Sequence, residues 1–271
     1  MVFQVQKISN YGTSTPAVAR TVVQGSELIQ VFPIGEEVKE KVKIVLFDLK
    51  RQLLRCVQIH DQIKAEVCKA KEEIAEKGLD FQSSGRAVTL PSVSDLQSQA
   101  ESFLQSAKLA LRDSASLLEP FFGESFDHRF HRIVSWAEQN LSVEDDLTQC
   151  LGHWEPWVKR IVTMRNAVDH PRDEPYGKLI VKNFKLLALR AGHVLQEPTW
   201  ALLSEPPSQL LPDMATIIEC IIRLAEDILV ICLLKNRGKF PLYIYEIPEE
   251  ERDRTCPIRL RVGIRQPKRQ T

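Results

Sequence analysis

Apolar side chains recur at helical spacing over most of this 271-residue chain. The first long run starts at Glu36 and continues to about Lys77, before Gly78 stops the helix. The same spacing predicts four further helices, at Leu96–Leu118, Phe130–Leu141, about Val143–His170 and Asp213 to about Arg237. The last of these is apolar on most of its faces, so we expect it at the centre of a helical bundle.

Three other stretches have the composition of strands. At the N-terminus, valine and isoleucine are frequent in two runs around Gly25 and Ser26, which predict a hairpin turn. The runs that predict strands are Val18–Gln24, Glu27–Phe32, Lys178–Leu189, His193–Leu203, Phe240–Ile247 and Pro257–Ile264. The fold class is therefore mainly α, with four to five helices in a bundle and small β additions at the N-terminus, at about 178–203 and at the C-terminus.

These elements divide the chain into three parts. We expect an N-terminal β element at 1–35, a helical bundle at 36–237 with a β insertion at about 172–212, and C-terminal strands with a basic tail at 238–271. Pro156 falls near the middle of the fourth helix, where it predicts a kink or a break. In the same helix, Trp154, Val158 and Ile161 form an apolar stripe, and Arg165 occupies the next position at which this stripe predicts an apolar residue.

Composition narrows the class of protein. Thirty-six basic residues balance thirty-six acidic ones, so any site for a polyanion is a local patch. Six cysteines without a C-x-x-C pair are typical of reduced, buried thiols in a cytosolic protein. The start of the chain lacks an export signal, and the uninterrupted apolar run Ile228–Leu234 is too short to span a bilayer. We expect a cytoplasmic protein without a membrane segment.

The run Arg165-Asn166-Ala167-Val168-Asp169-His170, followed by Pro171, places an arginine and a histidine at the end of a helix. RNA is cleaved without a metal when its 2′-hydroxyl attacks the neighbouring phosphorus. A histidine then moves protons near neutral pH, and an arginine holds the phosphoryl oxygens. The residue types suit this reaction. Five positions on a regular helix rotate by about 140°, so the pair requires a loosened last turn, which Pro171 favours.

At this point the chain resembles the HEPN family, helical domains of prokaryotic toxins and defence proteins marked by an arginine, four to six residues, and a histidine. The polar Asn166 after Arg165 fits that pattern, and the resemblance covers roughly Glu36 to Arg237. It implies a metal-independent endoribonuclease that needs no cofactor, with Arg165 and His170 catalytic and Asn166 orienting them. It also implies RNA as substrate, a homodimer whose two motifs form one composite cleft, and an antitoxin or a nucleotidyltransferase-like protein as a further partner.

Two other functions compete with catalysis. In one, a non-catalytic helical module uses the same cleft to bind a nucleotide or a protein. In the other, the chain is a structural scaffold in which a carboxylate such as Glu119 or Glu155 neutralises Arg165, and His170 interacts with the helix dipole.

Other candidate residues have structural interpretations. Arg55 and His60 repeat the motif in mid-helix, where the rotation cannot relax, so we interpret that match as chance. We expect His128 and His131 at a solvated helix start rather than on a metal, and Trp154 and Trp157 in packing rather than in base stacking. In the tail, the alternation of Ile258-Arg259-Leu260-Arg261-Val262 places two arginines on one strand face. That face serves either an RNA backbone or a charged edge strand.

Overall fold

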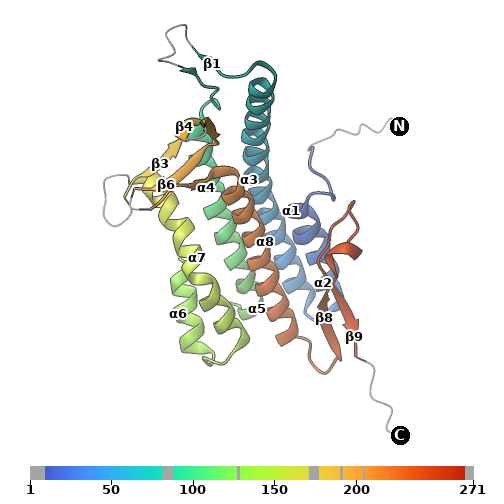
Figure 1. Ribbon diagram of the computed structural model, residues 1–271. Coiled ribbons are helices and arrows are strands. Elements are labelled where there is room, and N and C mark those ends of the chain that lie inside the picture. The colour runs from blue at the N-terminus through green and yellow to red at the C-terminus, as the bar shows by residue number, and fades with distance from the viewer. Residues whose placement is uncertain are drawn as a thin grey trace, which may run out of the picture. The chain divides into compact units, whose positions relative to one another are not determined.

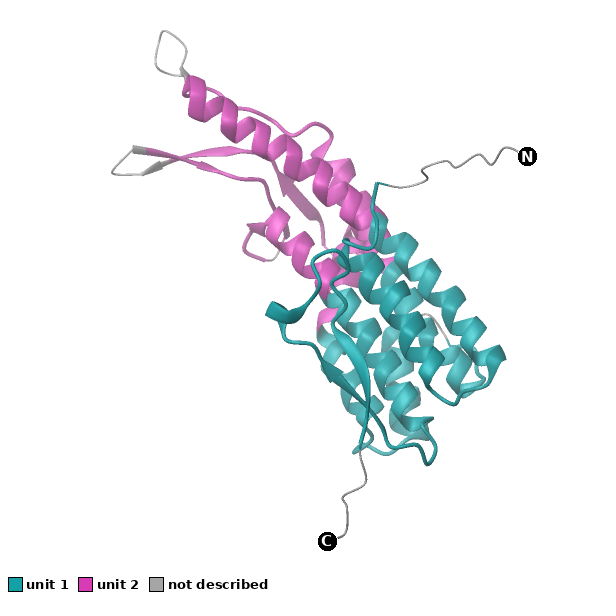
Figure 2. Cartoon of the chain, turned by 90° about the vertical axis from the view of Figure 1, so that its right-hand side faces the viewer, with its two compact units in different colours: residues 1–54, 109–156, 220–271 teal, residues 55–108, 157–219 magenta. Residues whose placement is uncertain are grey.

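The computed structural model describes residues 10–81, 88–126, 129–170, 177–189, 192–203 and 205–265. The chain divides into two compact units (Figure 2). Unit 1 contains residues 1–54, 109–156 and 220–271, and unit 2 contains residues 55–108 and 157–219.

Long helices dominate the described chain, as the apolar spacing predicts (Figure 1). Their bounds are α3 Glu36–Lys77, α4 Leu96–Ala115, α6 Phe130–Asn140, α7 Asp146–Asp169 and α8 Leu210–Lys235. The short segments η2 Ser116–Leu118 and α5 Glu119–Phe122 follow α4. The mainly helical class is confirmed. Among the described residues, no helix combines the length and the apolar composition needed to cross a membrane.

The predicted N-terminal strands are wrong, because residues 16–31 are helical. The segments are α1 Pro16–Val18, the π-helix η1 Ala19–Val23 and α2 Gln24–Val31. A β-carbon added to Gly25 would lie 2.6 Å from Cδ1 of Leu46, so this glycine permits close packing within unit 1 instead of forming a turn. With Leu28, Ile29 and Phe32 it forms a buried stripe at helical spacing. Tertiary packing has overridden the strand propensity of valine and isoleucine.

A buried ion pair lies in unit 1. The Arg20 guanidinium donates to both carboxylate oxygens of Glu226, over 2.9 Å from Nε and 2.6 Å from Nη2. The Gln24 amide donates to the same carboxylate over 2.8 Å, and Arg259 Nη1 lies 3.3 Å from it. The two arginines of the predicted strand face have different surroundings, because Arg259 contacts this network while Arg261 is exposed.

The two strands predicted near the C-terminus are present in unit 1, where they pair as a hairpin. Strand β8 Leu242–Glu246 pairs antiparallel with β9 Leu260–Ile264, and the short helix η3 Glu249–Glu251 lies between them in sequence. The side-chain oxygen of Gln24 accepts hydrogen bonds from the backbone N–H groups of Arg259 and Leu260, over 2.6 and 2.7 Å. These bonds hold the start of β9 against α2, and the hairpin lies beside that helix in Figure 1.

The predicted β insertion is confirmed in unit 2, although each predicted strand is divided in two. The strands are β3 Leu179–Lys182, β4 Lys185–Leu189, β5 Gly192–Gln196 and β6 Thr199–Leu202. Strand β3 pairs with β6, β4 pairs with β5, and β7 Ser208–Gln209 extends the first sheet. The first predicted strand is interrupted at Asn183, between β3 and β4. The side chain of Asn183 exchanges hydrogen bonds with the backbone of Val93. The paired segments β1 Asp80–Phe81 and β2 Val88–Thr89 lie between α3 and α4 in sequence.

Helix α7 runs through Pro156 without a break, contrary to one of the two expectations for that residue. A proline removes one helical hydrogen bond, but the buried side chains of Leu151 and Val158 on either side favour the continuous helix. In unit 1, Trp154 Nε1 donates to Asp227 over 3.0 Å.

Candidate functional site

The side chain of Arg165 is held by two partners in unit 2. Its Nε donates to the side-chain oxygen of Gln105 on α4 over 2.7 Å, and its Nη1 forms an ion pair with Asp169, one turn further along α7. The Arg165 side chain is 19% exposed and that of Asp169 is 38% exposed. The carboxylate that neutralises Arg165 is thus Asp169 and neither Glu119 nor Glu155. Asp169 is accessible to water.

A second cation lies beside this pair. Lys108 of α4 donates to the side-chain oxygen of Asn166 over 3.3 Å. Partial burial, and then the positive charge of Arg165, lower the pKa of Lys108, while Asp169 acts in the opposite direction. Two cations and one carboxylate leave one net positive charge at the edge of α4 and α7.

The apolar residues of the two helices explain why these polar groups meet. Phe103, Leu104 and Ala107 on α4 are buried, as are Ile161, Met164 and Ala167 on α7. Gln105, Lys108, Arg165 and Asn166 are the sequence neighbours of those residues, so they lie along the margin of the buried surfaces. Arg165 therefore lies beside the apolar stripe and not within it as the sequence pattern suggested.

His170 follows the last residue of α7 and is exposed. Its backbone N–H donates to the carbonyl oxygen of Asn166 over 2.8 Å, which is the regular helical bond. The expected loosening of the last turn is absent at this N–H group. On a regular helix, positions 165 and 170 lie about 140° apart around the helix axis. Gln105 and Asp169 hold the Arg165 guanidinium on the side of the helix from which Arg165 projects.

The second arginine–histidine match lies in the middle of α3, as expected. Arg55 is exposed. The Nδ1 atom of His60 lies 3.1 Å from a carboxylate oxygen of Asp61. The mid-helix position makes this match a suitable control for the one at the end of α7.

Two residues of the cluster, Lys108 and Gln105, were missed by the sequence analysis. Lys108 follows Ala107 of the apolar stripe, and a lysine at such a margin is common on amphipathic helices. Only the pairing of α4 with α7 distinguishes it from other surface lysines.

Neither the three thiols whose pKa burial raises most nor a group of metal-ligating side chains provides a candidate centre among the described residues. Burial raises the pKa of Cys56, Cys150 and Cys232 to about 12, so these side chains are neutral thiols at pH 7 and not nucleophiles. No group of three or more His, Cys, Asp or Glu side chains in the described chain is arranged to hold a metal ion. Of the two histidines considered earlier, His131 is exposed at the start of α6 and His128 lies outside the described residues.

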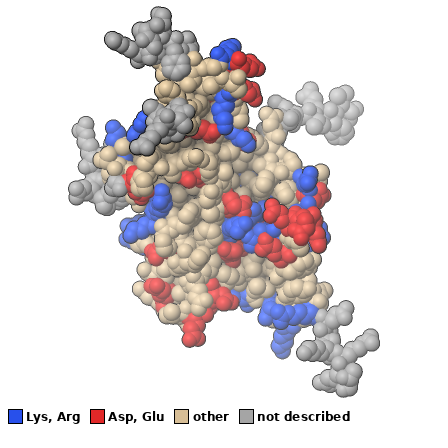
Figure 3. All heavy atoms as spheres, viewed as in Figure 1, with Lys and Arg blue, Asp and Glu red and all other residues tan. Residues whose placement is uncertain are grey.

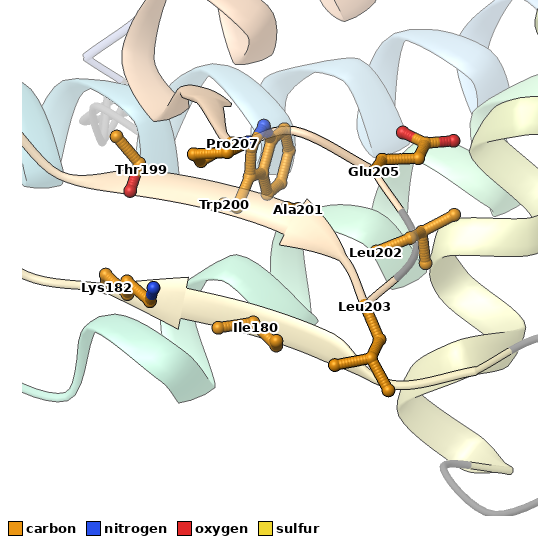
Figure 4. Close-up of a pocket in the computed structure, with 9 residues that line it drawn as sticks. All are labelled: Ile180, Lys182, Thr199, Trp200, Ala201, Leu202, Leu203, Glu205 and Pro207. Carbon is orange, nitrogen blue, oxygen red and sulfur yellow. The ribbon is translucent and has the colours of Figure 1, made fainter.

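A small cavity of about 160 Å³ lies over β3 and β6 in unit 2 (Figure 4). Lys182 and Glu205 lie toward opposite ends of it, and most of the residues between them are apolar. Glu205 also forms an ion pair with Arg160 of α7, whose Nη2 lies 3.0 Å from Oε2 of Glu205. The cavity therefore offers one short apolar surface between two charges, without a catalytic acid–base pair.

The chain matches no family model, no curated protein and no solved structure.

Proposed function

We propose that this chain is a metal-independent endoribonuclease of the HEPN type that cleaves RNA as a homodimer. The cluster at the end of α7 carries the proposal. Lys108 and Arg165 bring two cations to Asn166, in the last turn before His170, and the neutralising Asp169 is partly exposed. A scaffold role predicts a buried carboxylate on Arg165, and this carboxylate is accessible to water.

The first step is exchange of the anion on Arg165. A phosphodiester presents two oxygens to the guanidinium, as Asp169 does in part, and a partly exposed ion pair opposes that exchange only weakly. Lys108 adds a second positive charge next to the bound phosphate. The amide of Asn166, whose oxygen already accepts from Lys108, has two N–H donors for a phosphoryl oxygen.

The second step is proton transfer. The RNA 2′-oxygen attacks phosphorus and the bond to the 5′-oxygen breaks, which leaves a 2′,3′-cyclic phosphate and a 5′-hydroxyl. A neutral His170 from the second copy accepts the 2′-proton and, once protonated, donates a proton to the leaving 5′-oxygen, so each cleavage uses the Arg165 of one copy and the His170 of the other. The rotation between positions 165 and 170 within one chain is the reason for assigning this composite site to two copies.

The cleavage test uses a labelled single-stranded RNA and the purified full chain. We expect His170→Ala to lower the cleavage rate by about 10²- to 10⁴-fold, Arg165→Ala to lower it comparably, and EDTA to have no effect. Arg55→Ala and His60→Ala are matched controls and should retain full activity. Activity that EDTA abolishes, or that survives in both Arg165→Ala and His170→Ala, contradicts the proposal.

A mixing experiment tests the composite cleft. After the Arg165→Ala and His170→Ala chains are unfolded and refolded together, mixed dimers keep one intact arginine and one intact histidine. Part of the activity should return in the mixture, while each variant refolded alone stays inactive. No recovery in a sample shown to contain mixed dimers excludes a site shared between copies.

The second candidate is a non-catalytic module that binds a nucleotide through the same cations. The observation in its favour is the regular bond of His170 N–H to Asn166, which keeps that position turned away from Arg165. This function predicts that RNA binding weakens in Arg165→Ala, is unchanged in His170→Ala, and is never followed by cleavage.

A further inference from the structure

One face of the β8–β9 hairpin combines tyrosines and arginines. Tyr243 lies opposite Gly263, and Tyr245 lies opposite Arg261. Because side chains alternate between the faces of a strand, these four positions share one face, and Arg265 continues it beyond the end of β9. None of these five residues carries a negative charge.

The aromatic rings form a continuous surface with a cation beside them. The centroids of Tyr243 and Tyr245 are 5.8 Å apart with their planes tilted by 38°. The Arg265 guanidinium lies over the ring of Tyr243, 5.9 Å from its centroid. A β-carbon added to Gly263 would lie 2.5 Å from the Tyr243 ring, so only glycine lets that ring lie flat across the neighbouring strand.

This face is open to solvent. Tyr245 is 42% exposed, and Arg261 and Arg265 are both exposed. Among the described residues, no carboxylate lies within ion-pair distance of either arginine. Figure 3 shows a group of basic side chains at the lower right of the molecule, where β9 ends in Figure 1. An exposed aromatic ring costs solvation free energy, so two tyrosines beside unneutralised arginines indicate a ligand with flat apolar faces and negative charge.

We propose that this hairpin face binds single-stranded RNA, with bases stacked on Tyr245 and Tyr243 and phosphates held by Arg261 and Arg265. Bases of a single strand expose the π-faces that tyrosine contacts, whereas a duplex buries them in its own stack. Arginine supplies two donors for each phosphate. The anchoring of Arg259 and Leu260 by Gln24 keeps this surface ordered before the ligand arrives.

The test measures binding alone. A fluorescein-labelled 12-nucleotide oligouridine with 2′-O-methyl groups cannot be cleaved by 2′-hydroxyl attack, and its anisotropy reports binding to the full chain. We expect Tyr245→Ala to weaken binding by about fivefold or more, whereas Tyr245→Phe, which keeps the ring, stays within about twofold of the wild type. Arg261→Gln should lower the slope of log affinity against log salt concentration by about 0.7.

Phe47 supplies the matched control, because it is a half-exposed aromatic residue of unit 1 with the Lys50 ammonium 4.6 Å from its ring centroid. Phe47→Ala should leave binding unchanged. Circular dichroism establishes that each variant is folded. A folded Tyr245→Ala protein with wild-type affinity overturns the proposal, as does equal affinity for the single strand and for its duplex.

Single-stranded DNA of the same length is expected to compete, because stacking and phosphate contacts do not require the 2′-hydroxyl. Failure of both single strands to bind overturns the proposal. Since the probe cannot be cleaved, that result leaves the cleavage activity assigned to Arg165 and His170 to its own test.

Discussion

Two arginine–carboxylate pairs, one in each unit, differ in how completely the protein encloses them. In unit 1 the side chains of Arg20 and Glu226 are 6% and 3% exposed. In unit 2 those of Arg165 and Asp169 are 19% and 38% exposed. The same pair of functional groups therefore meets a dry environment in one unit and a partly wet one in the other.

The other groups around the two carboxylates, Glu226 and Asp169, also differ in how far they exclude water. Glu226 also accepts from Gln24 and lies 3.3 Å from Arg259, so its oxygens are saturated by groups of the fold. Asp169 faces water, and its arginine has Lys108 as a neighbour of like charge. A closed pair fixes one structure, whereas an open pair beside a second cation can exchange its carboxylate for another anion.

Matched carboxylate-to-amide changes test this difference, and the larger effect belongs to unit 1. Glu226→Gln keeps the shape of the side chain but leaves Arg20 buried without its counter-charge. We expect a loss of about 3 kcal/mol or more in the free energy of unfolding, measured by urea denaturation followed by circular dichroism. A loss no larger than that of the matching change in unit 2 would remove the distinction between the two pairs.

The corresponding change in unit 2 is Asp169→Asn. We expect it to alter the free energy of unfolding by less than about 1 kcal/mol, because water already solvates much of this pair. Without the competing charge, Arg165 should bind the uncleavable oligonucleotide several-fold more tightly in fluorescence anisotropy, provided that Tyr245→Ala is also present to remove the proposed hairpin site. Unchanged affinity in that double variant, relative to Tyr245→Ala alone, would show that Asp169 does not compete with RNA.

The smallest expected effect concerns Lys108, whose pKa is lowered by burial and by Arg165. The pKa of Lys108 in the folded protein lies below the unfolded value of 10.5. At a pH below this lowered pKa, the charged lysine therefore destabilises the folded state. Stability therefore rises with pH between the lowered pKa and 10.5. We expect Lys108→Met to raise the free energy of unfolding at pH 7 by up to about 0.5 kcal/mol, and this gain to vanish above pH 10.5.

Cleavage by Lys108→Met should decrease at the same time, since the phosphate loses a cation. Urea denaturation at pH 7 and at pH 11, together with the cleavage rate, measures both effects. Lower stability at pH 7 with unchanged cleavage would assign Lys108 to packing instead of to phosphate binding.

Periodicity predicted those parts of the fold in which one helix face or one strand pair dominates. The helices around Leu49, Leu104 and Ile228 and the hairpin at Tyr243 follow from local patterns that tertiary packing reinforces. The N-terminal segment did not follow, because the strand propensity of Val22 and Val23 opposes the helix and the deciding contact is that of Gly25 with Leu46. A contact between residues so far apart in sequence leaves no local signal.

The sequence by itself determined the mainly helical class and the end of α7 close to His170, because spacing and proline act locally. The tertiary structure decided that Arg165 pairs with Asp169 and Gln105, that Lys108 joins it, and that Glu226 rather than solvent receives Arg259. These choices depend on which helices lie side by side, and on how much water reaches each ion pair. Both are properties of packing, which the order of residues along one helix does not record.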